Sequence, residues 1–213
     1  MNPKKILSLI ETPYIDAQNL LALLGSYQRP RDWMQRMVKN GELIRLRNGF
    51  YLIAEKVQRG SERIIPYEQV ANFLYGPSYV SLEWALSFYG MIPERVYTVT
   101  SMTLGRMRKY HTPIGDFAYY PLRATSYSIG VEQKKSSCSV GGFLMASREK
   151  ALADFVFKSC KGLNQEQLKI ELLESKRLNV EIIHELDKAL LSEIAKNYRS
   201  KVVHYLVNLL GVL

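Results

Sequence analysis

The sequence predicts a mixed α+β protein, and three observations support this class. Apolar residues recur at helical spacing in three short segments before residue 40, and a β-prone stretch at residues 43–53 surrounds an Asn-Gly pair. The rest of the chain combines short β-prone runs with helical segments at both ends. We therefore expect a winged helix-turn-helix at residues 1–58 and a mixed α+β domain with terminal helices at residues 59–213.

The predicted helices of the first domain span residues 4–10, 17–24 and 30–40. Asp16 is placed to cap the second helix, and Pro30 suits the first position of the third. The third helix is amphipathic, because its apolar and charged residues fall on opposite faces. The apolar face consists of Trp33, Met34, Met37 and Val38, and the polar face of Arg31, Asp32, Gln35, Arg36 and Lys39.

Residues 43–53 predict a two-stranded hairpin. Asn-Gly is the strongest short hairpin signal, since the tight turn requires a positive φ at both central residues. In the register that a two-residue turn sets, Ile44 lies opposite Ile53 on an apolar face. Arg45 and Arg47 then project together from the other face.

The second domain is expected to begin after a polar linker at residues 55–65. Helical spacing predicts helices at residues 66–74 (with Phe73 turned inward), 82–89, 148–158 and repeatedly from residue 164 onward. Ser81 and Ser147 are the predicted N-caps of two of them. β-prone runs predict strands at residues 96–100, 117–121, 125–129 and 143–146.

The net charge of +9 is concentrated near the N-terminus. Residues 1–59 hold ten lysines and arginines against five acids, so more than half of the net charge lies in about a quarter of the chain. A basic protein without a membrane helix often binds a polyanion, usually nucleic acid. The position of the charge within the expected winged helix-turn-helix favours DNA.

The expected partner is double-stranded DNA, as an operator with repeated half-sites. The third helix fits the major groove, where its side chains reach base edges, and the hairpin tip would lie along the flanking backbone. The candidate base contacts are Arg31, Gln35 and Arg36. The other candidate contacts, mostly to phosphate, are Arg29, Lys39, Arg45, Arg47 and the amides of Asn48 and Gly49. The alternative is that this face docks an acidic protein, because the same order of elements occurs in protein-docking modules.

We expect neither enzymatic activity nor a cofactor or metal ion. The sequence lacks a Gly-Lys-Ser/Thr phosphate loop, a Rossmann fingerprint and a His-Glu-x-x-His motif. Cys138 and Cys160 are isolated from each other and from the three histidines, which argues against a disulfide framework or a zinc site. One alternative is a metal-dependent nuclease in which Asp116 and Glu132 hold Mg²⁺ and Lys134 orients water. That alternative requires the three side chains to converge.

The sequence also predicts a cytoplasmic protein without a membrane partner. No run of about 18 apolar residues occurs, and the basic N-terminus is not followed by the apolar core of a signal peptide. Sparse cysteines suit a reducing compartment.

Three segments of the chain resemble the AbiEi family of type IV antitoxins. The first is the hairpin at residues 45–52, with a basic–Gly–x–Tyr pattern. The second covers residues 79–100, where a Ser-capped helix is followed by Gly and Pro and then by a strand that ends in Thr. The third is Ala–x–x–Glu–Lys–Ala–Leu–x–Asp at residues 146–154. Together the segments span roughly residues 15–160 in the family's order.

This resemblance implies a bacterial antitoxin that represses its own operon through the N-terminal domain. It also implies a C-terminal domain that counters a nucleotidyltransferase-like toxin, with or without direct contact. Two roles are open for the residues of the second-domain motifs, which are Ser81, Glu83, Glu149, Lys150 and Asp154. They form a functional surface, or they serve the fold as helix caps and neighbours of the core, which is the role we favour. The alternative function is a winged-helix transcriptional regulator with an unrelated effector or interaction domain.

Overall fold

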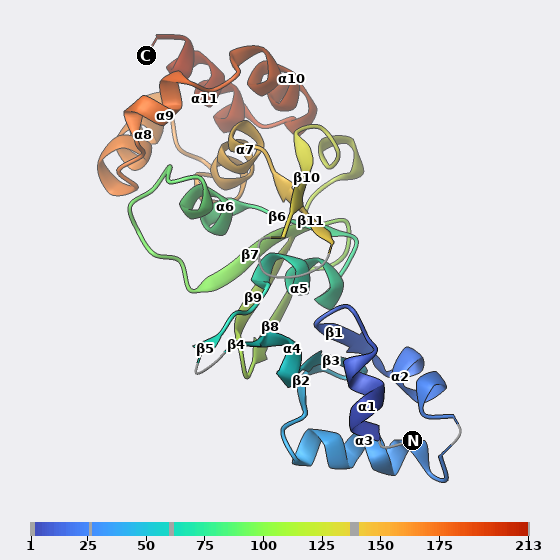
Figure 1. Ribbon diagram of the computed structural model, residues 1–213. Coiled ribbons are helices and arrows are strands. Elements are labelled where there is room, and N and C mark those ends of the chain that lie inside the picture. Colours follow the sequence, from blue (N-terminus) through green and yellow to red (C-terminus); the bar gives the residue numbers. More distant parts are fainter. Residues whose placement is uncertain (1–2, 26, 60–61, 137–140, 213) are drawn as a thin grey trace.

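A computed structural model describes residues 3–25, 27–59, 62–136 and 141–212. Figure 1 shows a small N-terminal unit at one end of the molecule and the C-terminal helices, in orange and red, at the other. Helices and strands are both abundant, so the predicted mixed α+β class is confirmed. Cys138 lies outside the described residues. None of the helices in the described ranges has the length and hydropathy needed to cross a lipid bilayer.

The N-terminal unit contains three helices and a three-stranded sheet. The helices are α1 (Pro3–Ser8), α2 (Ala17–Leu23) and α3 (Pro30–Lys39). The sheet has the order β1-β3-β2, with strands β1 (Tyr14–Asp16), β2 (Leu43–Arg47) and β3 (Phe50–Ile53). The predicted helices and hairpin are therefore confirmed, but the expected turn type is wrong, because only Gly49 (φ 76°) and not Asn48 has a positive φ. Strand β1 was not predicted, because three residues are too few to show a periodic pattern.

The predicted caps and helix faces of this unit are confirmed. The Asp16 side chain accepts the backbone N–H of Asn19 at 2.9 Å, and Pro30 occupies the first turn of α3. Met37 is buried, and Trp33 packs against the same core. The helix thus turns its apolar face inward and leaves its polar face to solvent.

The hairpin register differs from the prediction. The observed pairs are Leu43–Ile53, Ile44–Leu52, Arg45–Tyr51 and Arg47–Phe50. The predicted pairing of Ile44 with Ile53 is therefore wrong, and the reason is a β-bulge at Leu46, where two residues of β2 oppose one of β3. Because successive residues alternate between faces, the extra residue turns Arg45 and Arg47 to opposite faces of the sheet.

Strand β3 is buried on both faces and joins two hydrophobic cores. Tyr51 and Ile53 belong to the smaller core, beneath the N-terminal helices. Phe50 and Leu52, together with Leu46 of β2, belong to the larger core of the second region. A strand that is apolar on both faces is stable only between two covering layers. The two cores are therefore in contact through β3, although the sequence predicted two domains joined by a polar linker.

The segment expected to be a polar linker is partly structured. It contains α4 (Ala54–Val57), followed by the short strands β4 (Gln58–Arg59) and β5 (Glu62–Arg63), which pair with each other. Val57 is buried in the larger core, so this apolar residue holds the segment against the second region. The boundary between residues 58 and 59 remains a prediction.

A six-stranded sheet with the order β10-β11-β6-β7-β9-β8 forms the centre of the second region. Its strands are β6 (Ser78–Val80), β7 (Thr98–Thr103), β8 (Arg108–Thr112), β9 (Gly115–Pro121), β10 (Val131–Lys135) and β11 (Gly142–Ala146). Three of the four predicted strands correspond to β7, β9 and β11. The predicted strand at residues 125–129 is wrong, because a 3₁₀ turn, η1 (Ala124–Ser126), begins this segment. Strands β8 and β10 were missed because they are polar edge strands, and β6 was missed because it has only three residues.

Helices cover both faces of this sheet. α5 (Tyr67–Leu74) lies on one face, where the Tyr119 hydroxyl donates to the Ala71 carbonyl at 2.7 Å. α6 (Leu82–Phe88) and α7 (Arg148–Ser159) lie on the other face. The Tyr79 side chain projects from that face, and its hydroxyl donates to the Asp154 carboxylate of α7 at 2.9 Å. Phe73 of α5 is half exposed, so the prediction that it points inward is wrong. Its ring packs at a tilt against that of Tyr14 in the N-terminal unit, with the ring centroids 4.6 Å apart.

The C-terminal part is helical, as predicted. It consists of α8 (Gln165–Ile170), a π-helical turn η2 (Glu171–Ser175), α9 (Val180–His184), α10 (Lys188–Tyr198) and α11 (Lys201–Val212). Helices α10 and α11 pack on α7. They form an outer layer over α7 (Figure 1), so side chains of α10 can contact the buried side chains of α7.

Candidate functional site

The polar side chains of α3 lie on the outer surface of the N-terminal unit. Arg31, Gln35, Arg36 and Lys39 are exposed, as is Arg29 directly before the helix. In Figure 1, α3 lies at the end of the molecule farthest from α10 and α11. Within the described residues, no carboxylate lies at ion-pair distance from the four cations. Their charge is therefore not neutralised by an ion pair of the described residues, and it favours an external polyanion.

The N-terminal end of α3 is shaped by its flanking residues. Arg29 has a left-handed conformation with φ of 60°, and together with Pro30, Arg31 and Asp32 it lines a shallow hollow. Pro30 has no N–H, and the Asp32 N–H donates to the Arg29 carbonyl at 3.1 Å, so the arginine side chains are the main attraction for an anion at this hollow. One turn further on, the Arg36 guanidinium lies 5.4 Å from the centre of the Trp33 ring, which orients it along the surface.

Only one of the two hairpin arginines faces the same way as the helices. Arg45 lies opposite Tyr51, so it projects from the sheet face that carries the helices and the smaller core. Arg47 lies on the other face, where its Nε donates to the Leu74 carbonyl at 2.7 Å and its guanidinium lies 5.6 Å from the Phe50 ring. The structure thus groups Arg45 with α3. It places Arg47 beside the second region, whereas the Gly49 carbonyl of the turn accepts the N–H of Ala17, at the start of α2, at 2.9 Å.

Asp116, Glu132 and Lys134 do not converge. Asp116 lies on β9 and the other two on β10, and three strands separate β9 from β10. At about 4.8 Å per strand, the distance is roughly 19 Å. The Glu132 carboxylate pairs with Lys134 at 2.6 Å, and the Asp116 carboxylate lies 2.9 Å from Nδ1 of His111. No group of three or more metal-ligating side chains occurs in the described part of the chain. This placement overturns the nuclease alternative.

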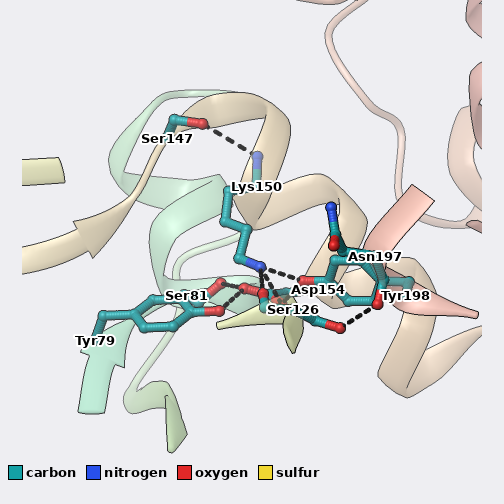
Figure 2. A network of polar contacts seen from close by, with 8 residues as sticks. All are labelled: Tyr79, Ser81, Ser126, Ser147, Lys150, Asp154, Asn197 and Tyr198. Atoms are coloured by element: carbon teal, nitrogen blue, oxygen red, sulfur yellow. Dashed lines mark hydrogen bonds and ion pairs between the residues drawn. The ribbon is translucent and has the colours of Figure 1, made fainter. Parts of the chain in front are cut away.

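A buried polar network lies between the six-stranded sheet, α7 and α10 (Figure 2). Lys150 and Asp154 are one turn apart on α7, and both side chains are 0% exposed. Nζ of Lys150 lies 3.9 Å from Oδ1 of Asp154. The same ammonium group donates to the Ser126 carbonyl and, at 2.6 Å, to the Tyr198 hydroxyl. A buried charge needs such partners, because it has lost its hydration.

The Asp154 carboxylate collects hydroxyl donors from three elements. Ser81 donates to it at 2.6 Å and Tyr79 at 2.9 Å, while Tyr198 donates from α10 (Figure 2). Burial raises the pKa of Asp154 above its ordinary value, although Lys150 and the hydroxyl donors oppose this effect. Burial likewise lowers the pKa of Lys150, against the attraction of Asp154.

The start of α6 explains why Ser81 is available to this network. Ser81 occupies the N-cap position, as predicted, but its side chain makes no capping bond. Instead, the Thr100 hydroxyl of β7 accepts the backbone N–H of Trp84 at 3.1 Å and donates to the Ser81 carbonyl at 2.6 Å. The predicted capping role of Ser81 is therefore wrong. The role of Ser147 is confirmed, because its Oγ accepts the Lys150 N–H at 3.2 Å.

The motif at residues 146–154 therefore lies in the interior. Glu149 is also nearly buried, and its carboxylate accepts the N–H of Asp187 at the start of α10 at 3.0 Å. The network holds α10 against α7 and the sheet, which is a role in the fold. Sequence reasoning did not find Tyr79 or Tyr198, because they are distant from α7 in the sequence and no local pattern marks them.

A comparison of the sequence with models of known protein families and with curated proteins finds no match. The surface on α3, with Arg45, is the candidate nucleic-acid interface because its cations are exposed and enter no ion pair of the described residues.

Proposed function

We propose that this chain binds double-stranded DNA through the exposed face of α3 and regulates transcription as a winged helix-turn-helix protein. The observation that carries this proposal is the exposed cationic face of α3, whose cations have no acidic partner within the described residues. An exposed helix of this kind fits the major groove, and the arginines at the hollow before it, Arg29 and Arg31, suit a phosphate.

The interface proposed here is smaller than the sequence suggested. It comprises α3 with Arg29 before it, and Arg45, which projects from the helix-bearing face of the sheet. Arg47 is bound to the Leu74 carbonyl, so we assign it to docking the N-terminal unit on the second region. The turn at Asn48 and Gly49 is also left out, because the Gly49 carbonyl is bonded to the N–H of Ala17 at 2.9 Å, which ties the turn to the start of α2.

The test is quantitative DNA binding with a matched surface control. Duplexes that the wild-type chain selects from a random pool serve as the specific probe, and an unselected random duplex serves as the non-specific one. Arg31→Ala and Arg36→Ala should each weaken specific binding by about 1–3 kcal/mol and relax the selected sequence. Affinity should also fall steeply with salt, because phosphate contacts release counterions. The control Lys188→Ala removes an exposed cation of α10 and should leave binding unchanged.

Wild-type affinity in both α3 variants would refute the assignment of this helix. Binding that hardly depends on salt would instead favour an acidic protein partner.

The regulator we propose is an antitoxin of the AbiEi type, because three segments of the sequence resemble that family in order. Such an antitoxin is expected to be encoded beside a nucleotidyltransferase toxin. The neighbouring gene, expressed alone, should arrest growth, and co-expression of this chain should restore it. If the neighbouring gene is harmless or unrelated, the antitoxin role is excluded while the DNA-binding proposal stands on its own test.

A further inference from the structure

A cationic cavity opens in the second region, far along the chain from α3. It has a volume of about 480 Å³ and lies where β9, the end of α7 and the turn between α10 and α11 meet. Four of its lining residues are cations: Arg123, Lys158, Lys161 and Arg199. Among the described residues that line it, none is acidic. Like charges at one site repel each other, so the arrangement is more stable when an anion is bound.

Only one of these cations has an ion-pair partner in the described residues. Nζ of Lys158 lies 3.4 Å from Oε1 of Glu83 and 4.1 Å from the centre of the Tyr120 ring. Arg123, Lys161 and Arg199 are exposed and enter no ion pair of the described chain. Three positive charges therefore remain to be balanced, which suits a polyphosphate better than a single carboxylate.

The backbone beside Arg199 adds donors to the same wall. Arg199 is left-handed, with φ of 47°, and Ser200 accepts the His204 N–H at 3.2 Å, so α11 begins there. The N–H groups of Arg199 and Ser200 take part in no main-chain hydrogen bond of the described residues. The first-turn N–H groups of a twelve-residue helix follow directly. This end of α11 carries positive partial charge in addition to the side chains.

The opposite part of the lining is apolar. Met102, Pro121 and Phe157 contribute to it, together with the ring of Tyr120. Sites for small organic ligands typically measure about 300–1,000 Å³ and combine an apolar wall with a few convergent polar groups. A ligand that satisfies both halves carries several phosphates and a planar apolar group.

We infer that this cavity binds a nucleoside polyphosphate, with its phosphates on Arg123, Lys161 and Arg199 and its base against the apolar wall. This site is separate from the proposed DNA interface. It also gives a reason for the Tyr198 contacts: Tyr198 lines the cavity and donates to buried Asp154, so the cavity wall is anchored in the network.

The test is calorimetric titration of the full chain with ATP, with tripolyphosphate as the phosphate-only probe at the same ionic strength. ATP should bind, and tripolyphosphate should bind at least tenfold more weakly because it leaves the apolar wall empty. Arg199→Gly should weaken ATP binding at least tenfold; glycine accepts the left-handed backbone while removing the guanidinium. Lys161→Gln, at an exposed position after α7, should act in the same direction.

Two control variants make the result specific. Lys188→Gln removes a cation elsewhere on α10, and Arg36→Ala alters only the proposed DNA interface; both should bind ATP as the wild type does. The inference is overturned if the wild type does not bind ATP or if tripolyphosphate binds as tightly. It is equally overturned if Arg199→Gly and Lys161→Gln both retain wild-type affinity.

Discussion

Replacing Asp154 by alanine is the most direct test of the buried network. The substitution leaves the Lys150 ammonium group without a carboxylate and removes the acceptor of three hydroxyl groups, those of Tyr79, Ser81 and Tyr198. Removing one partner of a buried ion pair destabilises a protein by about 3–5 kcal/mol. Since whole domains are stable by only about 5–15 kcal/mol, this loss is a large part of the total.

The assay is equilibrium unfolding in urea, followed by circular dichroism. Lys150→Met should cost a similar amount, because it leaves the Asp154 charge buried without its cation. The double variant should cost less than the two single losses added together, by about 1–3 kcal/mol, because neither charge then remains alone. Lys158→Met is the matched control on the same helix. It breaks a partly exposed pair with Glu83, both side chains being 25% exposed, and should cost about 1 kcal/mol or less.

The explanation of the network fails under either of two results. Single-variant losses no larger than that of Lys158→Met would show that the buried groups do not depend on each other. Strict additivity in the double variant would show the same.

Three further predictions concern other parts of the fold. Gly130→Ala should lower the free energy of unfolding by about 2–3 kcal/mol, because φ is +77° and the added Cβ would lie 2.9 Å from two side-chain atoms. Gly162→Ala has a similar φ of +89° but open space around it, so it should cost only about 1 kcal/mol. Thermal melts measure both losses, and equal losses would contradict the prediction. Burial raises the pKa of the Cys160 thiol to about 11, so little of it is thiolate at pH 8. In a Cys138→Ser variant, iodoacetamide at pH 8 should therefore label Cys160 only after unfolding. Rapid labelling of the native protein would refute its burial. Arg47→Ala should lower the free energy of unfolding by about 0.5–1.5 kcal/mol, because it removes the hydrogen bond to the Leu74 carbonyl. Its DNA affinity should stay within twofold of wild type. A loss of affinity as large as that of the α3 variants would show that Arg47 belongs to the DNA interface.

The parts of the structure that could be predicted are those decided by neighbouring residues. Helix α3 follows from the spacing of Trp33 and Met37, and the hairpin turn follows from its Asn-Gly pair. The exposed face of α3 could be predicted for the same reason, because one buried stripe of a helix leaves the other face to solvent. The bulge at Leu46 could not be predicted, because it depends on packing against the larger core on the other face of β3.

The candidate sites of the second region divide in the same way. Ser147 caps α7 through residues three positions away, and the sequence sufficed to predict it. Ser81 has equally good capping chemistry, yet its hydroxyl is used by Asp154, 73 positions away, and Thr100 takes its place. The cationic cavity likewise combines residues from β9, α7 and the turn before α11, which no spacing in the chain connects.

Hydrophobic spacing, turn chemistry and charge content by themselves determined the class of the fold, most helices and the basic character of the N-terminal unit. Only the tertiary structure decided that Arg45 and Arg47 face opposite ways, that Lys150 and Asp154 are interior, and that Asp116 lies about four strand spacings, or roughly 19 Å, from Glu132. The physical reason is the range of the interactions. A helix or turn forms from contacts within a few residues, whereas a bulge, a buried ion pair and a cavity depend on surfaces that meet only when the chain is folded.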